Sequence, residues 1–139
     1  MGRSEPLAEA CTLLLEGVVT SGLGEGKGFT ELPWVRREFL SKLGFEPYPG
    51  TFNLRLVGTA WADARAMLAK QPGIDIAAEP GFCAAKCFHV VVGGRITGAV
   101  VFPQIADYPF EKFEVISAVP MRETLPAQDG DCVQVSVLC

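Results

Sequence analysis

The sequence predicts a mainly β fold, a small closed β-barrel with two short flanking helices, on three observations. Short apolar or alternating runs typical of strands recur along the chain, and turn signals rich in glycine and proline separate them at short spacing. Two stretches have the periodicity of helices, and two helices are too few for a fold in which strands and helices alternate as βαβ units. Hydrophobic residues form 49% and charged residues 20% of the 139 residues, so we expect one domain with a real core.

The N-terminal part is expected to contribute a strand and the first helix. Residues 12–20 read as the first strand, which ends where a glycine-rich segment begins. Apolar and charged residues between positions 34 and 43 are spaced as in an amphipathic helix. Pro33 stands where helices favour a start, and Gly44 stands where they favour a cap.

A rigid turn containing two prolines then leads into the middle of the chain. Residues 52–56 alternate between apolar and polar and predict the second strand. Residues 59–70 predict the second helix, with Thr59 as its N-cap. A short strand is expected at 74–78.

The C-terminal half is expected to hold the remaining strands and one helical turn. Gly93-Gly94 is a hairpin signal that joins the first two of these strands. The expected strands are 82–92, 95–102, 113–118 and 132–138, and the helical turn is 121–125.

The overall composition excludes several classes of protein. A net charge of −4 argues against a dedicated nucleic-acid binder, and no apolar run approaches the roughly 18 residues that a membrane helix needs. The first residues lack a secretory pattern, so we expect a cytoplasmic monomer whose five cysteines are reduced. Residues 1–11 are expected to be an N-terminal extension of a barrel domain at 12–139.

Cys83, Cys87 and His89 would point to one face of a strand and so form a candidate metal cluster. A structural zinc site needs four ligands, and the chain has one histidine. The alternative is that small, semi-apolar cysteines fill a barrel wall.

A glycine-rich segment after the first strand is the first candidate site. Alternating glycines let successive amides turn inward and bind an anion, and a lysine can reach the outer phosphates of a nucleotide. The spacing fits neither a P-loop nor a dinucleotide fingerprint, so a flexible hairpin remains the alternative. The segment reads Gly22-Leu23-Gly24-Glu25-Gly26-Lys27-Gly28.

A second motif, Gly50-Thr51-Phe52-Asn53-Leu54, places a hydroxyl and an amide oxygen two residues apart, just after a tight turn. Magnesium prefers oxygen ligands and keeps several waters, so such a pair is enough protein ligation for the ion. Together the two motifs predict a site for a phosphate chain and its metal ion.

These motifs resemble the archaeal CTP-dependent riboflavin kinase family. The similarity runs from about residue 13 to the end, although 58–81 matches poorly. It implies a six-stranded Greek-key barrel of the cradle-loop type. It also implies transfer of the γ-phosphoryl group of CTP to the 5′-hydroxyl of riboflavin, giving FMN and CDP, whereas the residues alone leave CTP and ATP open. The matching blocks are 16–29, 43–54, 98–101, 114–116, 121–123 and 129–131.

The resemblance also implies roles for individual residues. Thr51 and Asn53 would ligate Mg²⁺, and Glu114 would contact the ribityl chain of the flavin as the candidate catalytic residue. Glu114 would either accept the proton of the riboflavin hydroxyl or orient that hydroxyl, and its alternative is an outward residue of an alternating strand. The nucleotide-binding residues would be Gly22, Leu23, Gly24, Glu25, Gly26, Lys27, Val119, Pro120, Met121 and Arg122.

The chain departs from the family pattern where a threonine and a histidine usually approach the flavin. Ala106 and Tyr108 occupy those positions. Tyr108 and Phe110 would either stack on a flat ring, as flavin-binding residues, or cover the barrel end. Arg122 would bind a phosphate or pair with acids at the surface. The alternative functions are therefore a non-catalytic nucleotide- or flavin-binding module, or a kinase with another small acceptor.

Overall fold

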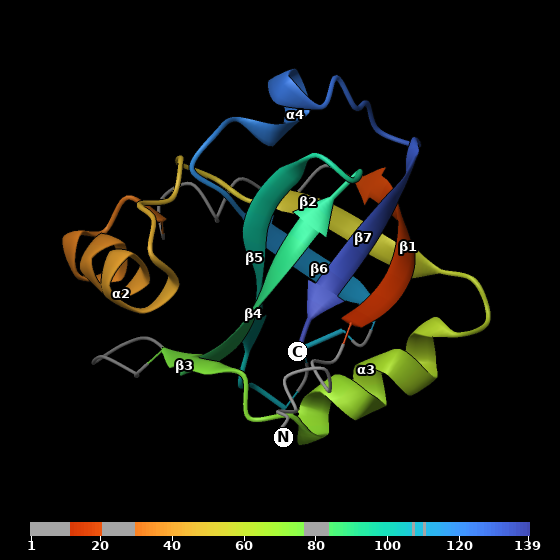
Figure 1. The fold of residues 1–139 in the computed structure, drawn as a ribbon, viewed down its shortest axis with the longest axis horizontal. Coiled ribbons are helices and arrows are strands. Elements are labelled where there is room, and N and C mark those ends of the chain that lie inside the picture. Colours follow the sequence, from red (N-terminus) through yellow and green to blue (C-terminus); the bar gives the residue numbers. More distant parts are fainter. Residues whose placement is uncertain (1–11, 21–29, 77–83, 107, 110) are drawn as a thin grey trace, which may run out of the picture.

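A single antiparallel sheet closes on itself to form the body of the molecule (Figure 1). The computed structural model describes residues 12–20, 30–76, 84–106, 108–109 and 111–139. The strand order is β3-β4-β5-β6-β2-β1-β7, and a further pairing of β4 with β7 closes the ring. Because β3 lies outside this ring, the closed barrel has six strands, which confirms the predicted fold class. The strands are β1 (Thr12–Thr20), β2 (Phe52–Val57), β3 (Ile74–Ile76), β4 (Ala85–Val92), β5 (Ile96–Pro103), β6 (Lys112–Ile116) and β7 (Cys132–Leu138).

The alternation of side chains along each strand divides them between the barrel interior and its outer face. On β2, Phe52 and Leu54 point into the interior, whereas Asn53 between them does not belong to the buried core. Phe113 and Val115 of β6 meet them inside the barrel. The register that pairs Asn53 with Glu114 therefore puts both polar residues on the outer face.

Helix α2 (Pro33–Leu43) covers part of that outer face, beside β3, β4 and β5 (Figure 1). Its buried residues Val35 and Phe39 pack in one cluster with Cys87 and Val101 of the sheet. Gly44 ends the helix in the left-handed conformation, with φ of 90°, as the sequence predicts.

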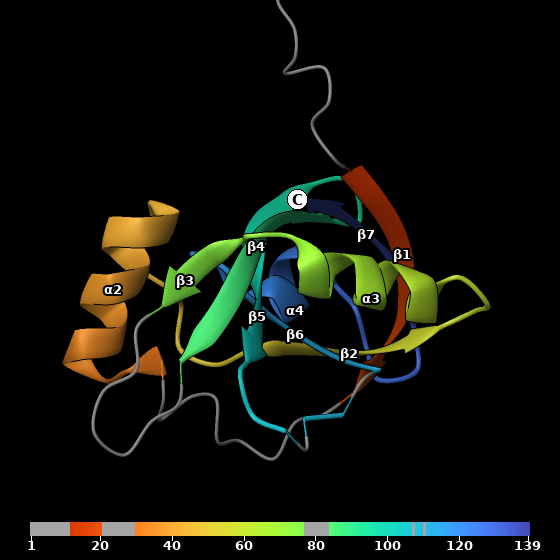
Figure 2. The same ribbon diagram turned by 90° about the horizontal axis from the view of Figure 1, so that it is seen from below.

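Helix α3 (Trp61–Lys70) lies across the opposite end of the barrel from α4 (Met121–Thr124), as Figures 1 and 2 show. Leu68 of α3 is fully buried in the interior cluster. The N-cap of α3 is Ala60, and no side chain caps this end. The predicted cap by Thr59 is therefore wrong, because the helix begins one residue too late for that hydroxyl to serve it.

The cysteines depart from one expectation. Cys139 is disulfide-bonded, so the prediction of five reduced thiols is wrong for this residue. Cys87 and Cys132 are free, and the partner of Cys139 is outside the described residues. Burial, followed by the charge of Asp75, raises the pKa of Cys87 to about 12, which keeps its thiol protonated and a poor metal ligand.

The candidate metal cluster of Cys83, Cys87 and His89 can be examined only in the parts of the chain that the structure describes. They contain no group of three or more His, Cys, Asp or Glu side chains that could hold a metal ion. Cys83 is outside them. Across the same residues, no helix has the length and apolar character needed to span a membrane.

Gly98 allows β5 and β6 to approach each other closely. A Cβ atom at this position would lie 2.4 Å from the backbone oxygen of Ile116. We therefore expect Gly98→Ala to lower the free energy of unfolding by about 2 kcal/mol, because the strands must shift to relieve the clash. Urea unfolding measures this loss. Thr97→Ala, at the exposed neighbouring position, is the control, and an equal loss in both variants would contradict the explanation.

Candidate active site

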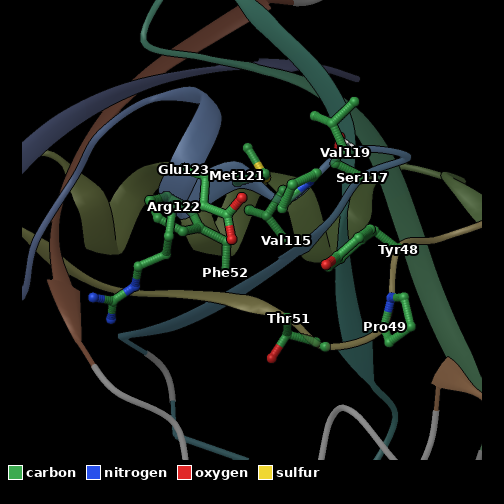
Figure 3. Close-up of a pocket in the computed structure, with 12 residues that line it drawn as sticks. Tyr48, Pro49, Thr51, Phe52, Val115, Ser117, Val119, Met121, Arg122 and Glu123 are labelled. Atoms are coloured by element: carbon green, nitrogen blue, oxygen red, sulfur yellow. Dashed lines mark hydrogen bonds between the residues drawn. The ribbon is translucent and has the colours of Figure 1, made fainter.

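A hollow of about 210 Å³ opens at the end of the barrel that carries α4 (Figure 3). One wall is the turn that precedes β2, and the other is the segment that joins β6 to α4. The lining includes Thr51 and all four predicted nucleotide-binding residues of the C-terminal half. The lining residues are Tyr48, Pro49, Gly50, Thr51, Phe52, Val115, Ser117, Val119, Pro120, Met121, Arg122 and Glu123.

A backbone hydrogen bond joins the two walls, and the side chain of Ser117 fixes one of them. The amide of Tyr48 donates to the carbonyl oxygen of Ser117 at 2.7 Å. Ser117 is buried, and its hydroxyl donates to the carbonyl oxygen of Thr97 at 3.0 Å and accepts from the amide of Val119 at 3.3 Å. The bend after β6 is thus fixed from both sides. Tyr48 and Ser117 were not predicted from the sequence, and the position of Tyr48 between two prolines is the signal that marks its turn as rigid.

The two ends of the hollow differ in chemistry. Tyr48 and Val119 lie at one end in Figure 3, with 47% and 38% of their surface exposed. Arg122 lies at the other end. An exposed aromatic and an aliphatic side chain suit a planar ring, and a guanidinium suits an anion.

Thr51 and Asn53, the predicted metal ligands, lie side by side. The Thr51 hydroxyl donates to Oδ1 of Asn53 at 3.0 Å. Two adjacent ligands of an octahedral Mg²⁺ ion, each about 2.1 Å from it, are separated by about 3.0 Å, so the spacing and the oxygen donors fit this ion. The turn before them depends on Gly50, whose φ is 107°, and whose amide donates to the Thr30 hydroxyl at 2.8 Å. Thr51 lines the hollow, whereas Asn53 lies beside it on the outer face of β2.

The predicted phosphate-binding residues Gly22 to Lys27 are outside the described residues, but the residues on either side are anchored at the site. The carbonyl oxygen of Thr20 accepts a hydrogen bond from Arg122 at 3.1 Å, and Thr20 pairs with Asn53 across the strands. Thr30 accepts from Gly50, as described above. Thr20 and Thr30, which lie on either side of the residues outside the described structure, are therefore both next to the turn and strand that carry Thr51 and Asn53.

Arg122 also forms an ion pair with Asp129. Both side chains are substantially exposed, so this is the surface pairing that the sequence offered as an alternative to phosphate binding. An exposed pair of this kind contributes little stability, and a phosphate can compete with Asp129 for the guanidinium.

Glu114, the candidate catalytic residue, lies in a row of outward-facing residues. It pairs with Asn53 of β2 on one side and with Val101 of β5 on the other. Its side chain is only 20% exposed, because Tyr108 reaches over it. The Tyr108 hydroxyl donates to Oε1 of Glu114 at 2.6 Å, and Oε2 lies 3.9 Å from Nζ of Lys112. Glu114 thus faces outward, as expected for a residue of an alternating strand, but its carboxylate is mostly covered and is not a solvated surface acid.

Tyr108 joins Glu114 to a second hollow, of about 350 Å³, beneath α3. Ala106 lines this hollow, as do Phe102 and Arg65, whose guanidinium lies 3.8 Å from the centre of the Phe102 ring. Burial is the main cause that raises the pKa of Tyr108, and the hydrogen bond and charge of Glu114 add to it, while Arg65 opposes it. The phenol therefore keeps its proton and stays the donor to Glu114.

The chain is similar to a described family and to several archaeal proteins. Residues 19–137 match the model of a family labelled CTP-dep_RFKase and described as domain of unknown function DUF120. The chain is 39% identical over 129 residues to a riboflavin kinase of Methanosarcina barkeri, covering 90% of this chain and 56% of that protein. It is 40% identical over 131 residues to a riboflavin kinase of Archaeoglobus fulgidus, and the match covers 91% of this chain and 55% of that protein. It is 38% identical over 134 residues to a riboflavin kinase of Pyrobaculum arsenaticum, and the match covers 91% of this chain and 61% of that protein. The chain thus spans somewhat more than half the length of these curated relatives.

The raised pKa of Tyr108 predicts how stability changes in alkaline solution. An unfolded tyrosine ionises near pH 10, whereas folded Tyr108 keeps its proton to higher pH, so the folded state binds more protons. The contribution of Tyr108 to the free energy of unfolding is therefore fully present below pH 10 and is lost as the pH rises above it. Urea unfolding of the wild type and Y108F between pH 8 and pH 11 should show the steeper decline in the wild type. Parallel curves would contradict the assignment.

Proposed function

This chain belongs to the CTP-dependent riboflavin kinase family, and on that premise we propose that it transfers the γ-phosphoryl group of CTP to the 5′-hydroxyl of riboflavin, giving FMN and CDP. The observation that carries the proposal is the oxygen pair of Thr51 and Asn53, 3.0 Å apart, at the edge of a hollow whose opposite wall is 119–122. The riboflavin kinase relatives support the choice of acceptor.

On the donor side, the base of CTP would occupy the apolar end of the hollow. Tyr48 and Val119 are the exposed apolar surface there, and Pro120 and Met121 continue the same wall. The phosphates would extend toward Arg122, which would exchange Asp129 for a phosphate oxygen. Gly22 to Lys27, whose flanking residues are anchored at this end, would bind the outer phosphates through backbone amides and the lysine.

We propose Mg²⁺ as the ion held by Thr51 and Asn53. When bound, it would neutralise charge on the β- and γ-phosphates during transfer. Two neutral protein oxygens leave most of the coordination sphere to water and phosphate, as is usual for this ion. The role of the chain is therefore to fix two ligands, Thr51 in a turn whose bend Gly50 provides and Asn53 on β2.

On the acceptor side, Glu114 would bind the hydroxyl that attacks the γ-phosphate. Directly paired residues on antiparallel strands have Cβ atoms about 5 Å apart, so Glu114 and Asn53 put the acceptor group next to the metal-bound phosphates. A carboxylate there can orient the hydroxyl or accept its proton. Tyr108 would contact the flavin on the same side, where it lines the hollow with Ala106.

A kinase for a different small acceptor is the second candidate. The departure at Ala106 and Tyr108 supports it, because both residues line the hollow beneath α3 beside Glu114. The same donor site would serve either acceptor. A non-catalytic nucleotide- or flavin-binding module is the remaining alternative.

One assay separates these possibilities. Purified protein is incubated with Mg²⁺, riboflavin and each of CTP, ATP, GTP and UTP, and the products are separated by chromatography. We expect FMN and CDP in the CTP reaction. Thermal shift with CTP, riboflavin and FMN runs in parallel, because a bound ligand raises the melting temperature. Nucleotide binding without FMN favours another acceptor or a binding module, and no product with any nucleotide removes the riboflavin kinase proposal.

The oxygen pair predicts the behaviour of Asn53→Ala. Loss of the amide oxygen removes one of two protein ligands, so we expect the rate of FMN formation to fall about tenfold or more. The Mg²⁺ concentration for half-maximal rate should rise at the same time. Steady-state kinetics over a Mg²⁺ series measures both values. Gln134→Ala, which removes an exposed amide from β7, is the control and should behave like the wild type. A normal Mg²⁺ dependence in Asn53→Ala would exclude Asn53 as a ligand.

A further inference from the structure

We propose that the hydroxyl of Tyr108 fixes the carboxylate of Glu114 in the orientation that receives the acceptor's hydroxyl group, so that Tyr108 is a positioning residue for phosphoryl transfer. This inference rests on the proposed kinase function, and it deepens that function by assigning a role to Tyr108, whose hydroxyl contacts Glu114.

The geometry divides the two oxygens of Glu114 between different tasks. Oε1 accepts a short, charge-assisted hydrogen bond of 2.6 Å from Tyr108. Oε2 is 3.9 Å from Nζ of Lys112, which is too far for a hydrogen bond. Oε2 is therefore the oxygen that can take the acceptor hydroxyl without breaking the contact with Tyr108.

Tyr108 is held firmly enough to act in this way. Its ring packs against the interior cluster of the barrel, and Nζ of Lys112 lies 5.5 Å from the ring centre. Its amide donates to the carbonyl oxygen of Ile105 at 3.4 Å. The elevated pKa of its phenol keeps the donor proton in place over the pH range of an enzyme assay. A fixed donor on one side thus limits the rotation of an otherwise flexible glutamate side chain.

Orientation matters here because Glu114 faces the metal side of the site. Its strand partner is Asn53, so the direction of Oε2 decides whether the bound hydroxyl meets the γ-phosphate in line. Small displacements of a reacting group cost large factors in rate. The hydroxyl of Tyr108 should therefore affect turnover of the acceptor more than binding of the nucleotide.

Y108F removes the hydroxyl and keeps the ring that packs against the core. We expect kcat for FMN formation to fall about tenfold, with KM for CTP unchanged within about twofold. The melting temperature at neutral pH should change by only a few degrees. A fall in kcat together with a matching rise in KM for CTP would indicate general damage and overturn the inference.

A double-mutant cycle tests whether Tyr108 acts through Glu114. Because the proposed role of the hydroxyl is to orient that carboxylate, Y108F should cause almost no further loss in the E114Q background. Equal factors in both backgrounds would mean that Tyr108 acts independently, and would overturn the inference. Y108L is the second variant, for use if Y108F does not fold. It also removes the hydroxyl and keeps an apolar side chain against the core, so it should show the kinetics expected of Y108F.

The outcomes separate this inference from the function on which it rests. A wild type that forms no FMN with any nucleotide removes the riboflavin kinase proposal itself. A wild type that forms FMN, with Y108F equal to it in kcat, removes only the role of Tyr108.

Discussion

The arrangement of the site depends on the antiparallel pairing of β2 with β1 on one side and with β6 on the other. These two pairings place β1, β2 and β6 next to one another, although β6 is far from the other two in the sequence. A row of outward residues then crosses the sheet from Thr20 through Asn53 and Glu114 to Val101. The alternation that sends Leu54 and Phe113 into the interior is the same alternation that keeps this row outside. The alternation of side chains along the strands therefore determines both which residues form the core and which residues form the candidate site.

Much of the fold was predictable because its local signals are strong. The strands at 12–20 and 132–138 have the predicted bounds, and α2 lies between Pro33 and the Gly44 cap. Family membership was also predicted from the glycine-rich segment and the Thr-x-Asn pair, and the family match confirms it. These features are visible in sequence because each depends on residues within one short segment.

The remaining features depend on contacts between distant segments. The hydrogen bond from Tyr48 to Ser117 joins the two walls of the hollow, and Ser117 belongs to no motif that the sequence shows. The start of α3 was misplaced by one residue because its cap position has no side-chain signal. The bond between Tyr108 and Glu114 requires the connection after β5 to fold back over β6, which no local pattern specifies.

The register of β6, which is fixed by pairing on both sides, limits where the sequence can change during evolution. Its neighbours β2 and β5 fix which way each side chain of β6 faces, and a slip of one position would turn Glu114 into the barrel. Insertions and substitutions in the preceding connection carry no such penalty. On the proposed function, substitutions in this connection could therefore change the acceptor without altering Thr51 or Asn53, the proposed metal ligands. New specificities should therefore arise more often through that connection than through the strands.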